Sequence, residues 1–181
     1  MSLREAIKSK HDAAEAHPFT ALLLSGEIPK QTYGDLLFNM TVIYSALEER
    51  MLHIGTFNDM PEMFRAEIMT NDLEELDIDG ITVHQSTIDC LERIGKVSDH
   101  DLMAYVYLYH MADMYGGQMI KKCIPGSGKR FDFENRPALI AKIREHLTDD
   151  LAEEANIAFD YTLELFDELY REHSQPNRGY N

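Results

Sequence analysis

The chain lacks several features that would mark particular protein classes. It has only two cysteines, Cys90 and Cys123, which form no CxxC or zinc-ligand spacing. We therefore expect two reduced, mostly buried thiols. No run of about 18 apolar residues is present, and the N-terminal segment has no apolar signal-peptide core. These absences predict a soluble cytoplasmic protein with no membrane association.

Positive charge is also scarce. Lys and Arg number 17 against 32 Asp and Glu, so the formal net charge at pH 7 is −15. Nucleic acids and anionic membranes attract basic surfaces, so this balance argues against both as partners. It does not exclude local basic clusters, which are Arg4/Lys8/Lys10, Lys121/Lys122 and Lys129/Arg130.

Strand signals are nearly absent, whereas apolar residues recur at helical spacing. The predicted helices cover 2–16, ending near Pro18; 30–56; Pro61 to about Leu73; Thr82 to Ile94, ending at Gly95; Ser98 to Lys122, with Ser98 and Asp101 as a capping box; Pro137 to about His146; and Thr148 through Leu169. We therefore predict a single all-α domain over residues 1–173, a helical bundle without internal repeats, and a frayed tail over residues 174–181.

Two adjacent glycines, Gly116 and Gly117, lie inside the helix that begins near Ser98. Each costs about 1 kcal/mol relative to alanine in a helix interior, so the pair predicts a kink. Glycine also leaves the main chain bare of side chains. A large flat ligand, or another helix, could therefore lie directly against this segment.

His11 differs from the other histidines in its neighbours. Lys8 and Glu15 lie three residues before it and four after it, on the same helix face. A histidine whose Nδ1 is hydrogen bonded can present Nε2 to a metal, and Glu15 is spaced to assist directly or through water. Lys8 and Arg4, one and two turns back, could meet anionic groups of a ligand. A surface ladder of Lys, His and Glu is the alternative interpretation.

The segment from Leu3 to Glu15 resembles the proximal helix of the heme oxygenase family, and Asp113-Met-Tyr-Gly-Gly-Gln118 resembles its distal-helix signature. The two motifs have the expected separation, and the resemblance covers nearly the whole chain. Other matching positions are Phe19, Gly26, Tyr33, Tyr44, Ala46–Glu48, Ala104–Tyr105, Glu154–Asn156, Phe159, Phe166 and Glu168–Leu169. The resemblance implies a bundle in which heme lies between a proximal helix and a kinked distal helix.

The resemblance also implies a reaction. Heme b would be both substrate and cofactor, with no separate metal site. It would be cleaved at a meso carbon, α by expectation, to biliverdin, carbon monoxide and ferrous iron. The other partners would be O2 and a ferredoxin or similar reductant. Since ferredoxins are acidic, docking would need a basic patch. The candidates for that patch are Arg4, Lys8, Lys10, Lys121 and Lys122.

Individual residues take roles from the same resemblance. His11 would be the axial ligand of the heme iron, with Glu15 behind it. Asp113 would anchor a chain of ordered waters beside bound oxygen, and Tyr44 would take part in that network. The remaining heme contacts would be Gly116 and Gly117 on the distal face, Arg4, Lys8, Tyr107 and Arg144 around the propionates, and Phe159.

Three positions depart from the family pattern. Ala112 stands where glycine is usual, Tyr115 where a small residue is usual, and Tyr109 where a basic residue is usual. An extra methyl group at Ala112 could move the water chain. These departures predict a changed distal pocket rather than a loss of heme binding.

Three other functions remain open from the residues. A non-catalytic heme-binding protein on the same scaffold would not need Asp113, and Ala112 favours it. A di-iron carboxylate oxidase would need two Glu-x-x-His pairs, but the chain has only Glu49-x-x-x-His53. In a helical binding protein without a small ligand, the glycine pair would mark a helix crossing.

Overall fold

Apolar residues at helical spacing form eight α-helices within residues 1–175, the part of the chain that this computed structural model describes. No β-strand occurs in these residues, so the predicted all-α fold is confirmed. The α-helices are α1 (Leu3–Glu15), α2 (Pro18–Leu24), α3 (Lys30–Ile54), α4 (Ala66–Leu76), α5 (Gln85–Ile94), α6 (Leu102–Lys121), α7 (Arg136–Arg144) and α8 (Ala152–Ser174). Three short 3-10 helices join them: η1 (Pro61–Met63), η2 (Lys129–Phe131) and η3 (Asp149–Leu151).

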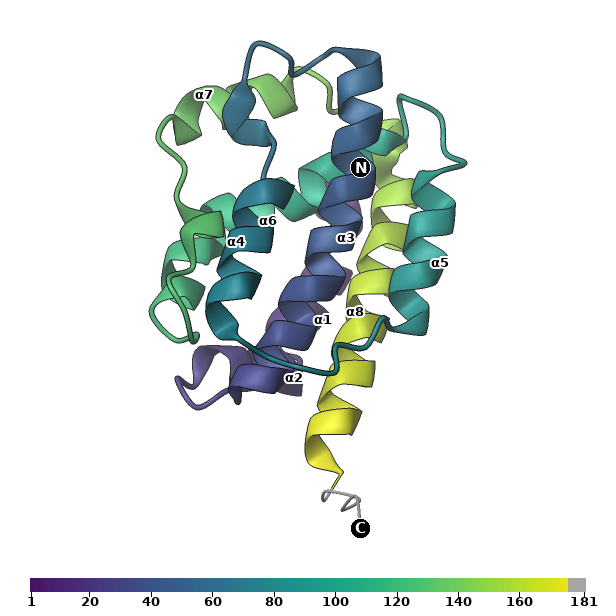
Figure 1. Cartoon of the computed structure of the whole chain (residues 1–181). Helices are drawn as coiled ribbons and strands as arrows, with labels where there is room; N and C mark the ends of the chain where they lie inside the picture. Colours follow the sequence, from purple (N-terminus) through teal and green to yellow (C-terminus); the bar gives the residue numbers. More distant parts are fainter. Residues whose placement is uncertain (176–181) are drawn as a thin grey trace.

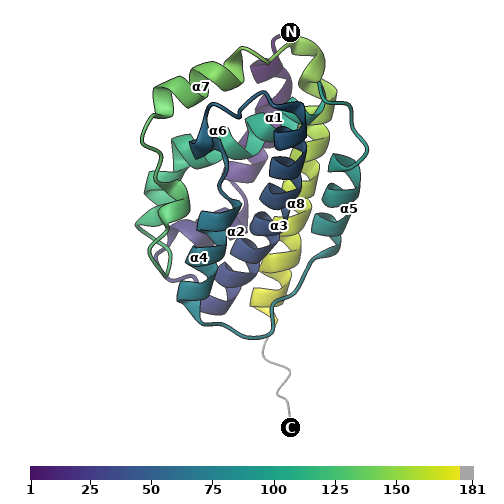
Figure 2. The ribbon, with the colours of Figure 1, turned by 45° about the horizontal axis from the view of Figure 1, so that its top comes forward.

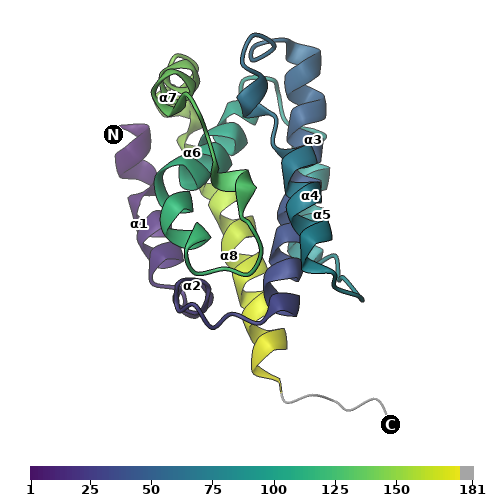
Figure 3. The ribbon, with the colours of Figure 1, turned by 60° about the vertical axis from the view of Figure 1, so that its left-hand side comes forward.

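Helix α8 is the shared neighbour of most other helices. It packs against α1, α2, α3, α5 and α6. Figure 1 shows α3 and α8 running side by side, with α5 along α8 and α4 beside α3. In Figure 3, α6 and α8 lie between α1 on one side and α3, α4 and α5 on the other. Helices α6 and α8 therefore form a central layer, and α1 packs against α8 on one side of it.

Helix α3 supplies much of the core. Its side chains Leu37, Tyr44, Leu47 and Met51 are fully buried, as is Tyr105 of α6. Burying an apolar side chain of this size contributes about 1.5–3 kcal/mol. The wide apolar stripe of α3 is thus covered by helices on several sides.

Helix α1 begins with a capping box, a motif that can be recognised from the sequence. The Glu5 N–H donates to Ser2 Oγ at 3.3 Å, and the Ser2 N–H donates to Glu5 Oε2 at 2.8 Å. These reciprocal bonds form a capping box. Leu3 and Ile7 are buried toward the bundle, so the opposite face of α1 is left exposed.

Helix α6 is hydrogen bonded as one helix through the glycine pair. Figures 1 and 2 show that it changes direction toward its C-terminal end, as the predicted kink requires. The Ser98 hydroxyl accepts from the Asp101 N–H at 3.0 Å, as expected of a capping pair. However, residues 99–101 form turns, and α6 starts only at Leu102.

Pro18 does more than end the first helix. It stands at the first position of α2, where a proline is well tolerated, and His17 Nδ1 accepts from the Phe19 N–H at 3.0 Å. This short helix was not predicted from the sequence, because Pro18 was interpreted only as the end of the first helix.

The single helix predicted from Pro61 to Leu73 is wrong. The chain forms η1, passes through an extended Phe64, and only then enters α4 at Ala66. Glu48 Oε1 of α3 accepts from the Arg65 N–H and from the Ala66 N–H, the latter at 2.8 Å. This carboxylate caps α4 from another helix, so the new helix starts there.

Two other predicted starts were early. α5 begins at Gln85 rather than Thr82, because the N–H groups of Thr82 and His84 are held by side chains of α3 in a non-helical segment. η3 follows Thr148, and α8 begins only at Ala152. The predicted tail also starts too early at its first residue, since α8 continues to Ser174. Residues 176–181 lie outside the described part.

Candidate functional site

His11 lies on the exposed face of α1, with 54% of its side chain accessible. Its Nε2 is 3.8 Å from Glu15 Oε1, and its Nδ1 is 3.8 Å from Asp12 Oδ1. Neither distance is a hydrogen bond. Glu15 therefore lies beside Nε2 rather than behind Nδ1, and Asp12 is the nearer carboxylate on the Nδ1 side. The ring of Phe159, from α8, stands edge-on at 6.3 Å between centroids.

Helix α6 has an exposed face beside its glycine pair. Ala112, Tyr115 and Met119 are exposed, the last two at 59% and 62%, and their spacing places them on one face with Gly116. A Cβ added to Gly116 would meet nothing within 4 Å. This exposed stripe is mainly apolar, and at Gly116 no side chain covers the main chain.

Gly117 has different surroundings from Gly116. It is buried, and a Cβ added there would lie 2.4 Å from Cδ1 of Phe131 in η2. The missing side chain therefore lets η2 pack closely against α6. The two glycines, predicted to share one role, face different neighbours.

Two cationic side chains, one from α1 and one from α7, act on Tyr107 of α6. Burial raises the pKa of the Tyr107 hydroxyl, while the positive charges of Arg4 on α1 and Arg144 on α7 oppose that rise. The predicted Arg4 and Arg144 therefore both act electrostatically on the predicted Tyr107. Arg144 also donates from NH2 to the Tyr115 hydroxyl at 3.1 Å.

Lys8 has a partner within its own helix. Its Nζ forms an ion pair with Asp12, one turn later on α1. Asp12 thereby contacts two predicted ligand-binding residues, Lys8 and His11, although the sequence analysis gave it no role. Its position four residues after Lys8 is the signal that could have revealed the pair.

Asp113 lies on the inner side of α6, with 7% of its surface exposed. The hydroxyl of Tyr44 donates to its Oδ2 at 2.7 Å. Burial and the nearby Asp113 carboxylate raise the pKa of Tyr44 well above its ordinary value, so its hydroxyl stays a proton donor. The structure therefore brings together Asp113 and Tyr44, which lie 69 positions apart.

Asp113 has a second partner that the sequence analysis did not assign to the site. Arg130 NH2 lies 3.0 Å from Oδ1 and 2.8 Å from Oδ2. Arg130 had been noted only as part of a basic cluster. Its burial and its partner depend on how η2 packs, and no residue spacing signals that.

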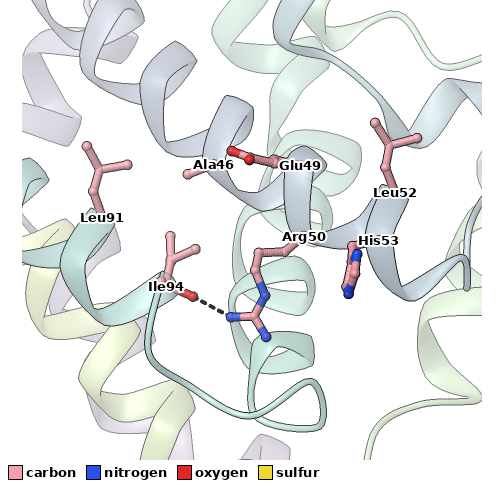
Figure 4. Close-up of a pocket in the computed structure, with 8 residues that line it drawn as sticks. Ala46, Glu49, Arg50, Leu52, His53, Leu91 and Ile94 are labelled. Carbon is pink, nitrogen blue, oxygen red and sulfur yellow. Dashed lines mark hydrogen bonds between the residues drawn. The ribbon is translucent and has the colours of Figure 1, made fainter.

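A groove of about 760 Å³ lies elsewhere, between α3 and the end of α5 (Figure 4). Arg50 reaches across it and donates from NH1 to the Ile94 carbonyl at 2.6 Å. None of the predicted site residues lines this groove.

The donor set and the surfaces fit the heme that the sequence predicts. His11 offers an accessible imidazole, the usual nitrogen ligand of heme iron. The stripe on α6 offers an open backbone position and apolar side chains for a flat ring. Arg4 and Arg144 offer positive charge for propionates.

Known proteins are similar to this chain over most of its length. A family model described as Heme oxygenase matches residues 1–168. Heme oxygenase 1 of Synechocystis sp. is 26% identical over 92% of this chain and 82% of its own length. Heme oxygenase 2 of Oryctolagus cuniculus is 28% identical over 96% of this chain and 67% of its own length.

Solved structures show the same fold. The crystal structure of heme oxygenase-1 from Synechocystis sp. PCC6803 in complex with heme has a TM-score of 0.82 and 23% identity, and covers 94% of this chain and 91% of that one. The structure of heme oxygenase from Leptospira interrogans has a TM-score of 0.78 and 22% identity, and covers 93% of this chain and 100% of that one.

Proposed function

Because the chain belongs to the heme oxygenase family, it is an oxidoreductase that cleaves heme to biliverdin, and we propose that α1 and α6 hold the heme between them. One observation carries this proposal. The accessible imidazole on α1 and the open glycine stripe on α6 belong to two helices that both pack against α8.

His11 is the proposed axial ligand. Its ring makes only long contacts with two carboxylates, so it can turn to the iron without breaking a hydrogen bond. Bound heme supplies the redox-active iron at which O2 is activated. Glu15 and Asp12 can then accept from the ring nitrogen that does not face the iron, which would orient the imidazole. Phe159 packs beside the ring.

Gly116 is the proposed distal contact. With no side chain there, the main chain of α6 can lie against the ring and leave room for a small ligand on the iron. The methyl group of Ala112 lies on the same exposed face, so it narrows this space. Gly117 contributes indirectly, because it seats η2 against α6.

Asp113 and Tyr44 form the proposed proton-handling network. Asp113 is the residue after Ala112 on α6, and its Oδ2 accepts a hydrogen bond from the Tyr44 hydroxyl. Its remaining acceptor capacity could hold a water molecule near the distal face, and such a water could relay protons there.

Arg4, Tyr107 and Arg144 are the proposed propionate contacts. Fixed charges at one edge determine how the ring is rotated in its plane, and therefore which meso carbon meets the oxygen. We propose the α carbon. Lys8 would join these residues only by leaving its ion pair with Asp12. The Arg144–Tyr115 hydrogen bond adds a tyrosine that the sequence analysis had not placed at this edge.

A ferredoxin is the proposed reductant. Of the five cations considered for docking, Lys8 pairs with Asp12, Lys10 with Asp160 and Lys121 with Asp132. Within residues 1–175, no ion pair involves Arg4 or Lys122. These two side chains therefore offer the stronger attraction to an acidic carrier.

His11→Ala tests the proposal. We expect the heme complex to lose its histidine-ligated absorption spectrum and most of its biliverdin yield, with partial recovery in added imidazole. His53→Ala, which removes another exposed histidine, is the matched control and should behave as wild type. An unchanged spectrum and yield in His11→Ala would mean that another residue holds the iron.

A further inference from the structure

Arg130 is a buried cation whose side chain donates hydrogen bonds to the carboxylate of Asp113. It is 4% exposed, and its NH2 donates to both carboxylate oxygens of Asp113. Its Nε has no partner within residues 1–175. The guanidinium also lies 5.8 Å from the ring centroid of Tyr44, the other partner of Asp113. Arg130, Asp113 and Tyr44 therefore form one buried cluster from three elements.

The backbone of η2 is anchored so that this cluster has little freedom. The Arg130 N–H donates to Asp72 Oδ2 of α4 at 2.8 Å. Arg65 NH2 donates to the carbonyl of Arg130 at 2.8 Å and to those of Lys129 and Asp132. The scaffold thus sets the position of Arg130 independently of Asp113.

The anchoring continues on α6. Gln118 Nε2 donates to the Phe131 carbonyl at 2.8 Å, and Gly117 leaves room for the Phe131 ring. Two residues of the Asp-x-x-Gly-Gly-Gln segment therefore hold η2, while its first residue binds the arginine that η2 carries. The segment and η2 act as one unit.

The hydrogen bonds at Asp113 leave it with one acceptor site for a further donor. Oδ2 accepts from both Tyr44 and Arg130, whereas Oδ1 accepts only from Arg130. Each carboxylate oxygen has about two acceptor sites. The remaining site is therefore on Oδ1.

We propose that Arg130 is a positioning residue for heme cleavage, which fixes the Asp113 carboxylate so that Oδ1 keeps one acceptor site for the distal side. This inference rests on the proposed role of Asp113. A buried carboxylate is destabilising without an opposite charge, and Arg130 provides that charge together with two hydrogen bonds. Without the guanidinium, the carboxylate loses these bonds and can rotate, which removes the defined acceptor.

The test compares Arg130→Gln and Arg130→Lys with wild type and with Arg93→Gln. Arg93 makes a similar two-point contact with the buried Glu154, at 2.9 and 2.5 Å, away from Asp113, so its variant controls for the loss of an ion pair. Three quantities are measured: heme affinity by absorbance titration, biliverdin formed per heme consumed with O2 and excess reductant, and the Asp113 carboxyl carbon signal by 13C NMR of the heme-free protein.

We expect Arg130→Gln to bind heme like wild type, to shift the Asp113 carbon signal, and to lower the biliverdin yield about tenfold or more. Arg130→Lys keeps the charge but not the guanidinium fork, so its loss should be smaller but measurable. Arg93→Gln should change neither the signal nor the yield. If Arg130→Gln does not fold, the lysine variant decides.

Two results would overturn the inference. One is a wild-type yield in Arg130→Gln, or in Arg130→Lys where only that variant folds. The other is an equal loss of yield in Arg93→Gln, which would make the effect a general one. A failure of the proposed site looks different, because wild-type protein and His11→Ala would then share the same spectrum and yield.

Discussion

The carboxylate of Asp113 is bound by side chains from two other elements, Tyr44 of α3 and Arg130 of η2. Tyr44 and Asp113 were both predicted from the sequence, and the structure joins them by a 2.7 Å hydrogen bond. Tyr109 stands where the resemblance expects a basic residue, but it is buried and its hydroxyl lies 3.6 Å from Cys90 Sγ. The basic partner of Asp113 is Arg130 of η2.

Tyr44→Phe tests the network at the residue scale. The change removes a donor to an ionised acceptor, so the free energy of unfolding should fall by about 1.5–3 kcal/mol. Tyr33→Phe is the matched control, because Tyr33 is equally buried but its hydroxyl has no partner within residues 1–175. Urea unfolding of the heme-free proteins measures both, and equal losses would contradict the role of the Tyr44 bond.

At the scale of elements, a helix start could be predicted where its cap is local in sequence, but not where the cap comes from another helix. The start of α1 was predictable because Ser2 and Glu5 lie within one helical turn. The start of α4 was not, because its capping carboxylate, Glu48, is 18 positions before Ala66. The long helices were thus found from their apolar spacing, whereas the short α2 was missed, and the start of α4 was missed because another helix supplies its cap.

Glu48 makes a pH-dependent contribution to the start of α4. Burial raises the pKa of its carboxyl above the ordinary 4.5, although the Ala66 and Arg65 N–H groups oppose this shift. A raised folded-state pKa means that the folded protein holds the proton more tightly than the unfolded chain. Ionisation of Glu48 therefore lowers stability as pH rises from about 4.5 through the folded-state pKa.

Glu48→Gln keeps an acceptor oxygen but cannot ionise. We expect its free energy of unfolding to fall less than that of wild type between pH 4.5 and 7. Glu48→Ala removes the cap and should cost about 1–2 kcal/mol at any pH in this range. Denaturant unfolding across the range checks both, and parallel pH profiles for wild type and Glu48→Gln would refute the expectation.

At the scale of the whole molecule, the net charge of −15 opposes an acidic partner. Ion pairs with Asp12, Asp160 and Asp132 further reduce the local positive charge. No helix within residues 1–175 has the length and apolar character of a membrane span. Cytoplasmic location and the ferredoxin stay predictions.

Electron transfer from ferredoxin should depend on Arg4 and Lys122. If these cations guide docking, the reduction rate should fall as salt concentration rises, since salt screens exposed charges over about 10 Å at 0.1 M. Arg4→Gln and Lys122→Gln should each lower the rate, and Lys96→Gln is a control for loss of a lysine whose partner is Glu92. Stopped-flow reduction at several salt concentrations measures this, and a rate that rises with salt would rule out an attractive patch.

By itself, the sequence determined the helical class, most helices, and the residues His11, Tyr44 and Asp113 as candidates. Helical periodicity and short motifs are local, so they can be read along a chain. Only the tertiary structure decided that Gly116 is open while Gly117 seats Phe131. It also decided that Asp113 pairs with Arg130, because burial and charge pairing depend on which elements pack together.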